Sequence, residues 1–229
     1  MSHDLPEKTA KILSKIRRKY KVSLDPFKVR DISLDILQVN DIEPLLAGKD
    51  PFKDVASFPF WARLWEASII LADSIASTTP VENQTLLELG AGLGAPGLVA
   101  AAKGYKVTLS DYETHILDFQ KVSAHANNLN DISFKIIDWK KPPKMARFDT
   151  IIGAEILFRD EFFQPLLNVF SQYLKPDGTI FLAHDVRRKS LARFLSLAEQ
   201  DFTIATQSRK LKFDDEERTI ILNRLQPRT

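Results

Sequence analysis

The sequence lacks cysteine altogether, which excludes disulfide bonds, thiol nucleophiles and cysteine-ligated metals from its 229 residues. The four histidines do not have the spacing of a metal-ligand set, so we expect no metal site; they are His3, His115, His125 and His184. No apolar run approaches the roughly 18 residues that a membrane-spanning helix needs. The first residues, MSHDLPEK, contain no apolar signal core. These absences favour a cytoplasmic protein.

The net charge is also small, at +2, so partners such as nucleic acids or membranes are not expected from the total. The charge is nevertheless uneven, because residues 8–21 are almost purely basic. The basic positions are Lys8, Lys11, Lys15, Arg17, Arg18, Lys19 and Lys21. This stretch is either the solvated face of a helix or a docking surface for an acidic partner.

Apolar residues make up 44% of the chain, which is enough for one sizeable core with a small N-terminal extension. We expect residues 1–57 to form that extension and to pack on a domain formed by residues 58–229. Apolar residues at helical spacing predict a helix over residues 7–21. Partly regular alternation predicts one or two strands over residues 27–39, and residues 45–60 are rich in turn formers.

The rest of the chain alternates between strand and helix patterns. After a helical pattern at residues 61–75, strands are expected at 85–90, 106–111, 133–138, 148–157 and 179–185, and helices at 95–104, 112–129, 162–174 and 187–200, with a turn at 176–178. Such alternation implies parallel strands, because parallel strands need crossover connections. Two final strands, at 202–213 and 218–226, have no helix between them. The fold predicted is therefore α/β: a Rossmann-like, doubly wound, seven-stranded sheet that is mostly parallel, with a C-terminal antiparallel hairpin.

Half of the eight glycines lie within residues 90–97, directly after the first strand of the alternating region. Glycine there lets the backbone turn sharply, approach a ligand closely and aim helix N-terminal amides at it. GLGAPG fits the dinucleotide-binding pattern GxGxxG, whereas ELGAGLG fits the acidic-x-Gly-x-Gly-x-Gly pattern of methyltransferases. The second also accounts for Glu88, because a carboxylate suits the ammonium of S-adenosylmethionine and not a pyrophosphate. Gly90, Gly92 and Gly94 would then approach the cofactor; a glycine turn without a ligand is the remaining interpretation.

Three later strands also end in acids. Asp111 ends the second strand, where doubly wound proteins bind ligands, and its carboxylate can accept both ribose hydroxyls, while Tyr112 can lie against adenine. Asp138 and Trp139 end the third strand, where a carboxylate can take the adenine amino group and an indole can cover the ring. Glu155 ends the fourth. Each acid alone fits a turn or a helix cap equally well. Their coincidence after a glycine turn favours a cofactor site.

Residues 60–225 resemble the class I, seven-β-strand methyltransferases, and within them the family 16 protein-lysine methyltransferases. The resemblance rests on the segments LWEASIILADSI, LLELGAGLGAPGLVAAAKGYKVTLSD, DW, GAEILF and FLAHDVRR. It implies that S-adenosylmethionine is the cofactor and S-adenosylhomocysteine its product. The positions that would line the cofactor are Trp65, Glu88, Gly90, Asp111, Asp138, Trp139 and Ala154. Glu155 and Phe158 would face the incoming lysine, at positions where the family most often has Asp and Tyr.

The function that this resemblance implies is in-line methyl transfer to lysine side chains of a protein. Phe158 and Trp61 would wall an apolar channel that favours the neutral amine, and Glu155 would orient it. A small-molecule N-methyltransferase on the same fold is the main alternative, followed by an NAD-dependent oxidoreductase and a non-catalytic cofactor-binding protein. In a purely structural alternative, Glu155 caps the following helix and Phe158 belongs to the core.

Overall fold

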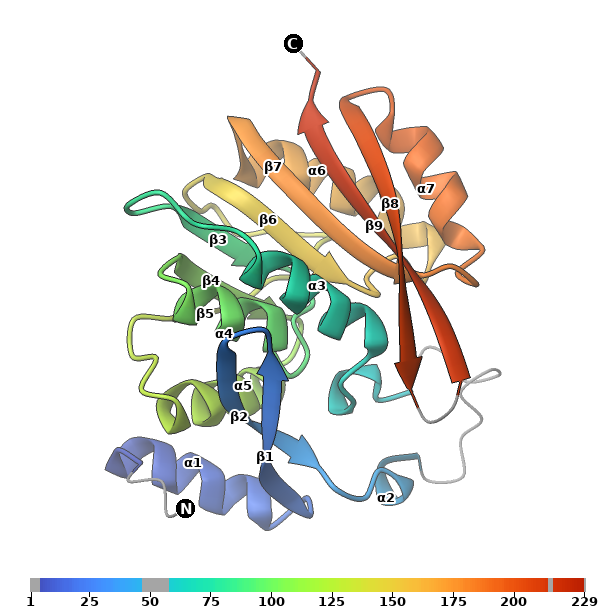
Figure 1. Cartoon of the computed structure of the whole chain (residues 1–229). Coiled ribbons are helices and arrows are strands. Elements are labelled where there is room, and N and C mark those ends of the chain that lie inside the picture. The colour runs from blue at the N-terminus through green and yellow to red at the C-terminus, as the bar shows by residue number, and fades with distance from the viewer. Residues whose placement is uncertain (1–4, 47–57, 214–215, 229) are drawn as a thin grey trace.

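The computed structural model describes residues 5–46, 58–213 and 216–228, and it contains the predicted seven-stranded sheet (Figure 1). Across the sheet the strands follow the order β5-β4-β3-β6-β7-β9-β8. Their bounds are β3 Thr85–Glu88, β4 Lys106–Asp111, β5 Ser133–Ile136, β6 Phe148–Ala154, β7 Leu174–Asp185, β8 Phe202–Phe213 and β9 Glu216–Pro227. Strands β3 to β7 pair in parallel, whereas β9 is antiparallel to β7 and β8. The predicted fold class, including the C-terminal hairpin, is confirmed.

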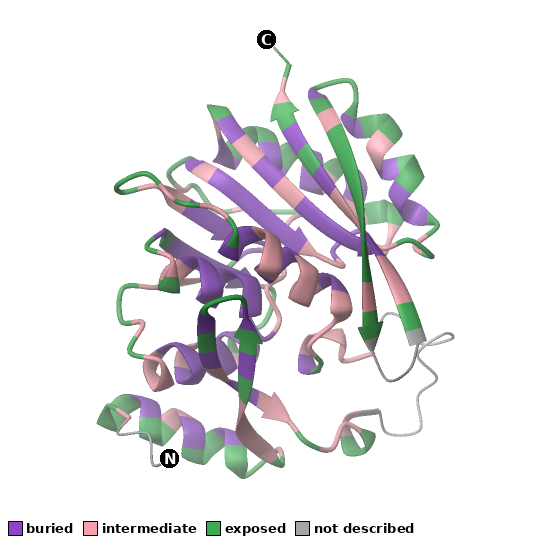
Figure 2. Cartoon of the chain, in the orientation of Figure 1, coloured by how far each residue is buried: buried purple, intermediate pink, exposed green. Residues whose placement is uncertain are grey.

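Helices cover both faces of this sheet (Figure 1). They are α3 Glu66–Ala76, α4 Ala95–Ala102, α5 Thr114–Ala126, α6 Phe163–Tyr173 and α7 Ser190–Ala198. Buried residues of α3, α4 and α5 share one apolar cluster, and those of α6 and α7 share a second. The central strands must therefore be apolar on both sides, and Figure 2 shows them largely buried. In β3 the fully buried Leu86 belongs to the first cluster and Leu87 to the second. None of the described helices is long and apolar enough to cross a membrane.

The N-terminal extension packs on α5. Its elements are helix α1 Glu7–Arg17, the antiparallel strands β1 Val22–Val29 and β2 Ile32–Val39, and the short helix α2 Glu43–Leu46. The Thr9 hydroxyl lies 3.0 Å from His125 Nδ1, and the Leu37 amide donates to the Ser123 hydroxyl over 3.0 Å. Apolar residues of α1, β1 and β2 also belong to the core cluster of α3 to α5. The predicted boundary at residue 57 lies outside the described residues.

The basic side of α1 and of the turn after it faces solvent. Lys11 pairs with Glu7, and Lys21 pairs with Asp41 over 3.6 Å. The other basic residues of this stretch are exposed and form no ion pair with any described residue: Lys8, Lys15, Arg17, Arg18 and Lys19. This arrangement is compatible with both interpretations of the basic stretch, the solvated face and the docking surface.

Several predicted elements were wrong in their limits. The helix predicted over residues 7–21 ends at Arg17, and the first strand begins at Val22 and not at residue 27. Residues 61–65 do not join α3, because Phe60–Ala62 form a 3-10 turn and Trp65 is extended as the N-cap of the helix. Residues 176–178 do not interrupt β7. The pairing of β7 with β6 is irregular there instead, since its register shifts between Phe148 and Thr150 of β6. Such an irregularity accommodates proline and glycine within a strand. Residues 47–57 of the predicted loop lie outside the described part of the chain.

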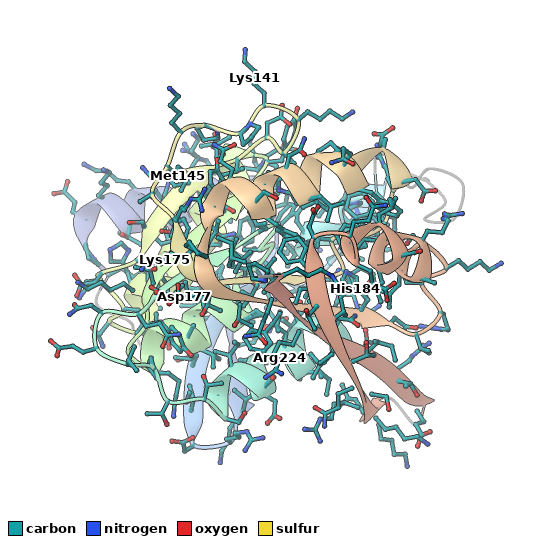
Figure 3. All side chains as sticks on the ribbon, turned by 90° about the horizontal axis from the view of Figure 1, so that it is seen from above. Lys141, Met145, Lys175, Asp177, His184 and Arg224 are labelled. Carbon is teal, nitrogen blue, oxygen red and sulfur yellow. The ribbon has the colours of Figure 1, made fainter. Side chains whose placement is uncertain are left out.

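His184 on β7 is fully buried (Figure 3), whereas Lys141 projects from the surface in the same view. Neither ring nitrogen of His184 has a hydrogen-bond partner among the described residues. Burial, and secondly the charge of Arg188, lower the pKa of this histidine to about 3. The imidazole is therefore neutral at neutral pH, and it does not line the cavity described next.

Candidate functional site

A cavity of about 530 Å³ opens where the parallel strands β3 to β7 end. Its walls come from the loops that follow β3, β4, β5, β6 and β7 and from the residues that precede α3. Doubly wound sheets bind ligands at this edge, because strand order reverses there and the loops diverge. All predicted site residues except Glu88 line the cavity: Trp65, Gly90, Gly92, Gly94, Asp111, Tyr112, Asp138, Trp139, Ala154, Glu155 and Phe158.

The glycine loop between β3 and α4 forms the floor of this cavity. Gly90, Gly92 and Gly94 have φ angles of +58°, +53° and +78°, a conformation that other residues adopt at a cost. A Cβ at Gly90 would lie 3.0 Å from the Ile156 Cγ2 atom and 3.3 Å from the Trp139 ring. A side chain at this position would therefore press on Ile156 and on the Trp139 ring, which both line the cavity.

We predict that Gly90→Ala weakens cofactor binding. Gly104 supplies a control, because its φ of +98° is also in the range that residues with a side chain rarely adopt, and the nearest atom to its added Cβ, on Pro80, is 4.0 Å away. Both variants should lose about 1–2 kcal/mol of stability from the left-handed conformation. Only Gly90→Ala should also raise the Kd for S-adenosylmethionine, measured by calorimetry. Equal affinity in the two variants would contradict this assignment of the loop.

Asp111, at the end of β4, is hydrogen-bonded to the glycine loop. Its Oδ2 atom accepts the Gly92 amide over 2.8 Å, and its Oδ1 atom accepts the Tyr112 amide over 2.7 Å. Burial raises the pKa of Asp111 to about 6, although both hydrogen bonds oppose that rise. Each carboxylate oxygen has a second lone pair, so Asp111 can still accept two hydroxyl donors from the cavity. Tyr112 itself is exposed at the rim, at 66% of its surface.

Glu88 is not where the sequence predicts it. Its side chain lies behind the loop, 2% exposed, and Oε2 accepts the Gly97 amide in α4 over 2.8 Å. Burial raises its pKa to about 8, so the carboxyl group is largely neutral at pH 7. The side chain does not line the cavity, so it is not placed to pair with a ligand ammonium. Glu88 instead fastens the glycine loop to α4, a role that the strand-end pattern does not distinguish from ligand binding.

The remaining predicted cofactor residues line two sides of the cavity. Trp139 packs against Gly90 and meets the Phe162 ring edge-on at 5.5 Å between centroids. Asp138 accepts the amide of Lys140, which leaves its second oxygen available to the cavity. The indole N–H of Trp65 donates to the Phe60 carbonyl over 2.7 Å, so Trp65 offers its ring and not its donor. Ala154, the last residue of β6, lines the cavity between these walls.

Glu155 follows Ala154 with a φ of +55°, an uncommon conformation for a residue with a side chain. Its Oε1 atom accepts the Asp185 amide over 2.6 Å, and its Oε2 atom accepts Arg188 Nε over 3.0 Å. Burial raises the pKa of Glu155, and Arg188 opposes that rise. The carboxylate therefore bonds across to the loop after β7, and no hydrogen bond to the following helix is present.

Aromatic rings wall the cavity beside Glu155. Phe158 lies between Phe60 and Phe162, with centroids 6.1 and 5.9 Å away, so it belongs to the wall and not to the core. Trp61 also lines the cavity but packs on His115 and Phe119, on the side of the glycine loop. Phe60, and not Trp61, is thus the partner of Phe158.

Sequence reasoning missed Phe60, Phe162 and Arg188. Arg188 follows β7, the fifth parallel strand, which also ends in an acid, Asp185. The strand-end pattern that singled out Asp111 would have pointed to this loop as well. Phe60 and Phe162 carry no such signal, because neither stands at a strand end. Phe60 lies in the 3-10 turn before α3, and Phe162 is the last residue before α6.

Residues 56–201 match the protein family described as lysine methyltransferase. The chain belongs to this family. It is 30% identical over 150 residues to the protein N-lysine methyltransferase METTL21A of Xenopus tropicalis, which covers 63% of this chain and 69% of that protein. It is 30% identical over 158 residues to EEF1A lysine methyltransferase 3 of Mus musculus, covering 65% of this chain and 66% of that one.

A solved structure of the N-methyltransferase NodS from Bradyrhizobium japonicum WM9, in complex with S-adenosyl-L-homocysteine, has a TM-score of 0.57 to this fold. It covers 82% of this chain and 97% of that one at 18% identity, a level that shows the fold alone. Together with the family match, this likeness identifies the chain as an S-adenosylmethionine-dependent methyltransferase with a Rossmann-like fold.

The cavity of this lysine methyltransferase family member suits that cofactor. The glycine floor presents backbone without side chains to the cavity, and the volume of about 530 Å³ lies within the range of small-molecule sites. Asp111 has free acceptor capacity for a ribose, and Trp139 has a ring face for a base. These acceptors and this ring face match the nucleoside part of the cofactor.

Proposed function

We propose that this enzyme methylates lysine side chains of a protein substrate, with Glu155 at the acceptor end of the cavity and Asp111 at the cofactor end. The single observation that carries the proposal is the placement of the Glu155 carboxylate beside an aromatic wall in the same cavity as the glycine loop. Relatives at 30% identity over 150 and 158 residues are named as lysine methyltransferases, which supports lysine as the acceptor. Relatives at 32% and 30% identity over the shorter spans of 111 and 115 residues are named as histone-arginine methyltransferases.

The cofactor end would be held by residues with separate tasks. Asp111 would accept the ribose hydroxyls, Asp138 the adenine amino group, and Trp139 would cover the base. Gly90, Gly92 and Ala154 would let the amino acid part approach the backbone. When bound, S-adenosylmethionine supplies an electrophilic methyl group, whose bond to sulfur breaks, leaving the electron pair on sulfur, as the bond to the acceptor nitrogen forms.

The acceptor end must present a neutral amine, because a lysine ammonium has no lone pair and its usual pKa is about 10.4. Phe60, Phe158 and Phe162 would form an apolar channel that disfavours the charged form. Their faces can hold the ammonium before it releases its proton to water. Glu155 would then accept a hydrogen bond from the amine and direct its lone pair along the line of attack. Phe158 has no hydroxyl, so that orienting bond rests on Glu155.

Transfer of radiolabelled methyl from S-adenosylmethionine into a cell lysate tests the proposal. The products are resolved on a gel, with and without protease. Discrete protease-sensitive bands that are absent with an Asp111→Ala variant support methylation of protein. Label confined to small molecules would replace this proposal with a small-molecule N-methyltransferase on the same fold.

A further inference from the structure

Two loops at the acceptor end of the cavity are fastened to each other through Glu155. The residues from the end of β7 to the start of α7 supply four hydrogen bonds. One from the Asp185 amide and two from the Arg188 guanidinium go to the Glu155 carboxylate, and one from the Ser190 hydroxyl goes to the Leu157 carbonyl. The backbone amide of Glu155 in turn donates to the Ala183 carbonyl over 2.9 Å. The strained φ of Glu155 is thus held by bonds on both sides of the residue.

Arg188 is placed to act on Glu155 and on the cavity together. Both Nε and Nη2 of Arg188 contact the same oxygen of Glu155, Oε2. The Arg188 side chain is only 29% exposed, and the Glu155 side chain only 12%. A guanidinium held against a poorly hydrated carboxylate cancels most of its charge. Arg188 also lines the cavity itself, so its charge is near any group that reaches Glu155.

Most of the other charged groups around this pair have partners of their own, although Asp185 raises the pKa of Glu155 and the Arg159 guanidinium lies 5.7 Å from the centroid of the Phe158 ring. The further charged residues that line the cavity are Arg63, Asp111, Glu113, Asp138, Lys140, Arg159 and Glu161. Arg63 pairs with Glu66, and Arg159 and Lys140 both pair with Glu161. Asp185, on the same loop, is held by Arg187. On the far side His184 is buried and neutral at neutral pH. Arg188 is therefore the counter-charge of Glu155.

We propose that Arg188 is a positioning residue for methyl transfer: it fixes the Glu155 carboxylate and cancels the charge that would otherwise keep the lysine protonated. This inference rests on the proposed function. A bare carboxylate would raise the pKa of an adjacent lysine ammonium and so delay its deprotonation. Paired with Arg188, Glu155 still has a lone pair on Oε1 for the amine, because Oε1 accepts only the Asp185 amide, and the pair as a whole is neutral.

The first test needs no substrate. The Glu155 carboxyl carbon is followed by ¹³C NMR against pH in the free protein and is assigned from the spectrum of Glu155→Gln. In Arg188→Met the pKa of Glu155 should rise by about one unit or more, as expected for loss of an adjacent opposite charge. The control Arg187→Met removes the neighbouring guanidinium, which faces Asp185, and should leave the Glu155 titration unchanged. An unchanged titration in Arg188→Met would overturn the inference.

The second test follows the rate of transfer into lysate protein between pH 7 and pH 10. Arg188→Met should move the alkaline rise of the rate to higher pH by about one unit, so its deficit is largest near pH 7. Arg188→Lys keeps the charge without the guanidinium fork, so it should keep the wild-type pH profile at a reduced maximum rate. S-adenosylmethionine binding should be normal in both variants. A uniform loss at every pH in Arg188→Met would show a merely structural role and overturn the inference. No transfer by the wild-type protein would instead overturn the proposed function.

Discussion

Replacing Glu155 with Ala is expected to lower the rate of methyl transfer about a hundredfold or more while the Kd for S-adenosylmethionine stays unchanged, because misplacing a reacting group by an ångström costs that much. Two effects add in this variant. The amine loses the acceptor that directs its lone pair, and Arg188 loses its partner. The unpaired guanidinium then repels an approaching lysine ammonium. Initial rates at saturating cofactor, together with calorimetric binding, separate the two quantities.

The matched control for this prediction is Asp160→Ala. Asp160 is an exposed acid in the same connection between β6 and α6, and its partner is Arg193 at the surface. Its removal takes away a carboxylate and an ion pair but nothing in the cavity, so the rate should not change. A Glu155→Ala variant that binds the cofactor and keeps full activity would remove Glu155 from the mechanism.

The second large effect is expected at Asp111. Asp111→Asn should raise the Kd for S-adenosylmethionine about a hundredfold, since two hydrogen bonds to a charged group, worth about 1.5–3 kcal/mol each, become neutral. Asparagine keeps the size of the side chain, and its oxygen can still accept the Gly92 amide, so the glycine loop should remain folded. Asp131→Asn, an exposed aspartate far from the cavity walls, is the control and should bind normally. Calorimetry on both variants measures the difference.

The same carboxylate should make cofactor binding pH-dependent. Burial raises the pKa of Asp111 to about 6 in the free protein, and hydroxyl donors from a ribose would favour its charged form. The affinity for S-adenosylmethionine should therefore be highest above about pH 6. It should fall as the pH drops below that value, by at most about tenfold per pH unit. The Asp111→Asn variant has no such group and should show no fall in this window. An equal slope in both proteins would assign the pH dependence to another residue.

The sequence predicts the sheet well because its signals are local and repeated. Strand patterns alternate with helices from residue 85 to residue 200, except that β6 follows β5 directly. The absence of a helix between β8 and β9 correctly predicts their antiparallel pairing. The strand-end rule places Asp111, Asp138 and Glu155 at one edge, and all three line one cavity. Parallel connectivity is enough to bring strand ends together, so this part of the site follows from the order of elements.

What the sequence does not predict is the direction in which a side chain points. Glu88 ends a strand as Asp111 does, yet it points behind the loop toward Gly97 and is neutral at pH 7. Phe60 and Trp61 are adjacent aromatic residues, and only the turn that they occupy decides which one meets Phe158. The Arg188 partnership joins two loops that are separate in the sequence. Such contacts depend on how the loops fold together, which no local pattern contains.

The most direct test of the account is the chemical identity of the transferred label. Protein labelled in the lysate with radioactive S-adenosylmethionine is hydrolysed to amino acids and separated beside methylated lysine, histidine and arginine standards. The account predicts that the label co-elutes with methylated lysine and that the Glu155→Ala and Asp111→Ala proteins leave no label. Label in methylhistidine or methylarginine, or full labelling by the Glu155→Ala protein, would contradict it.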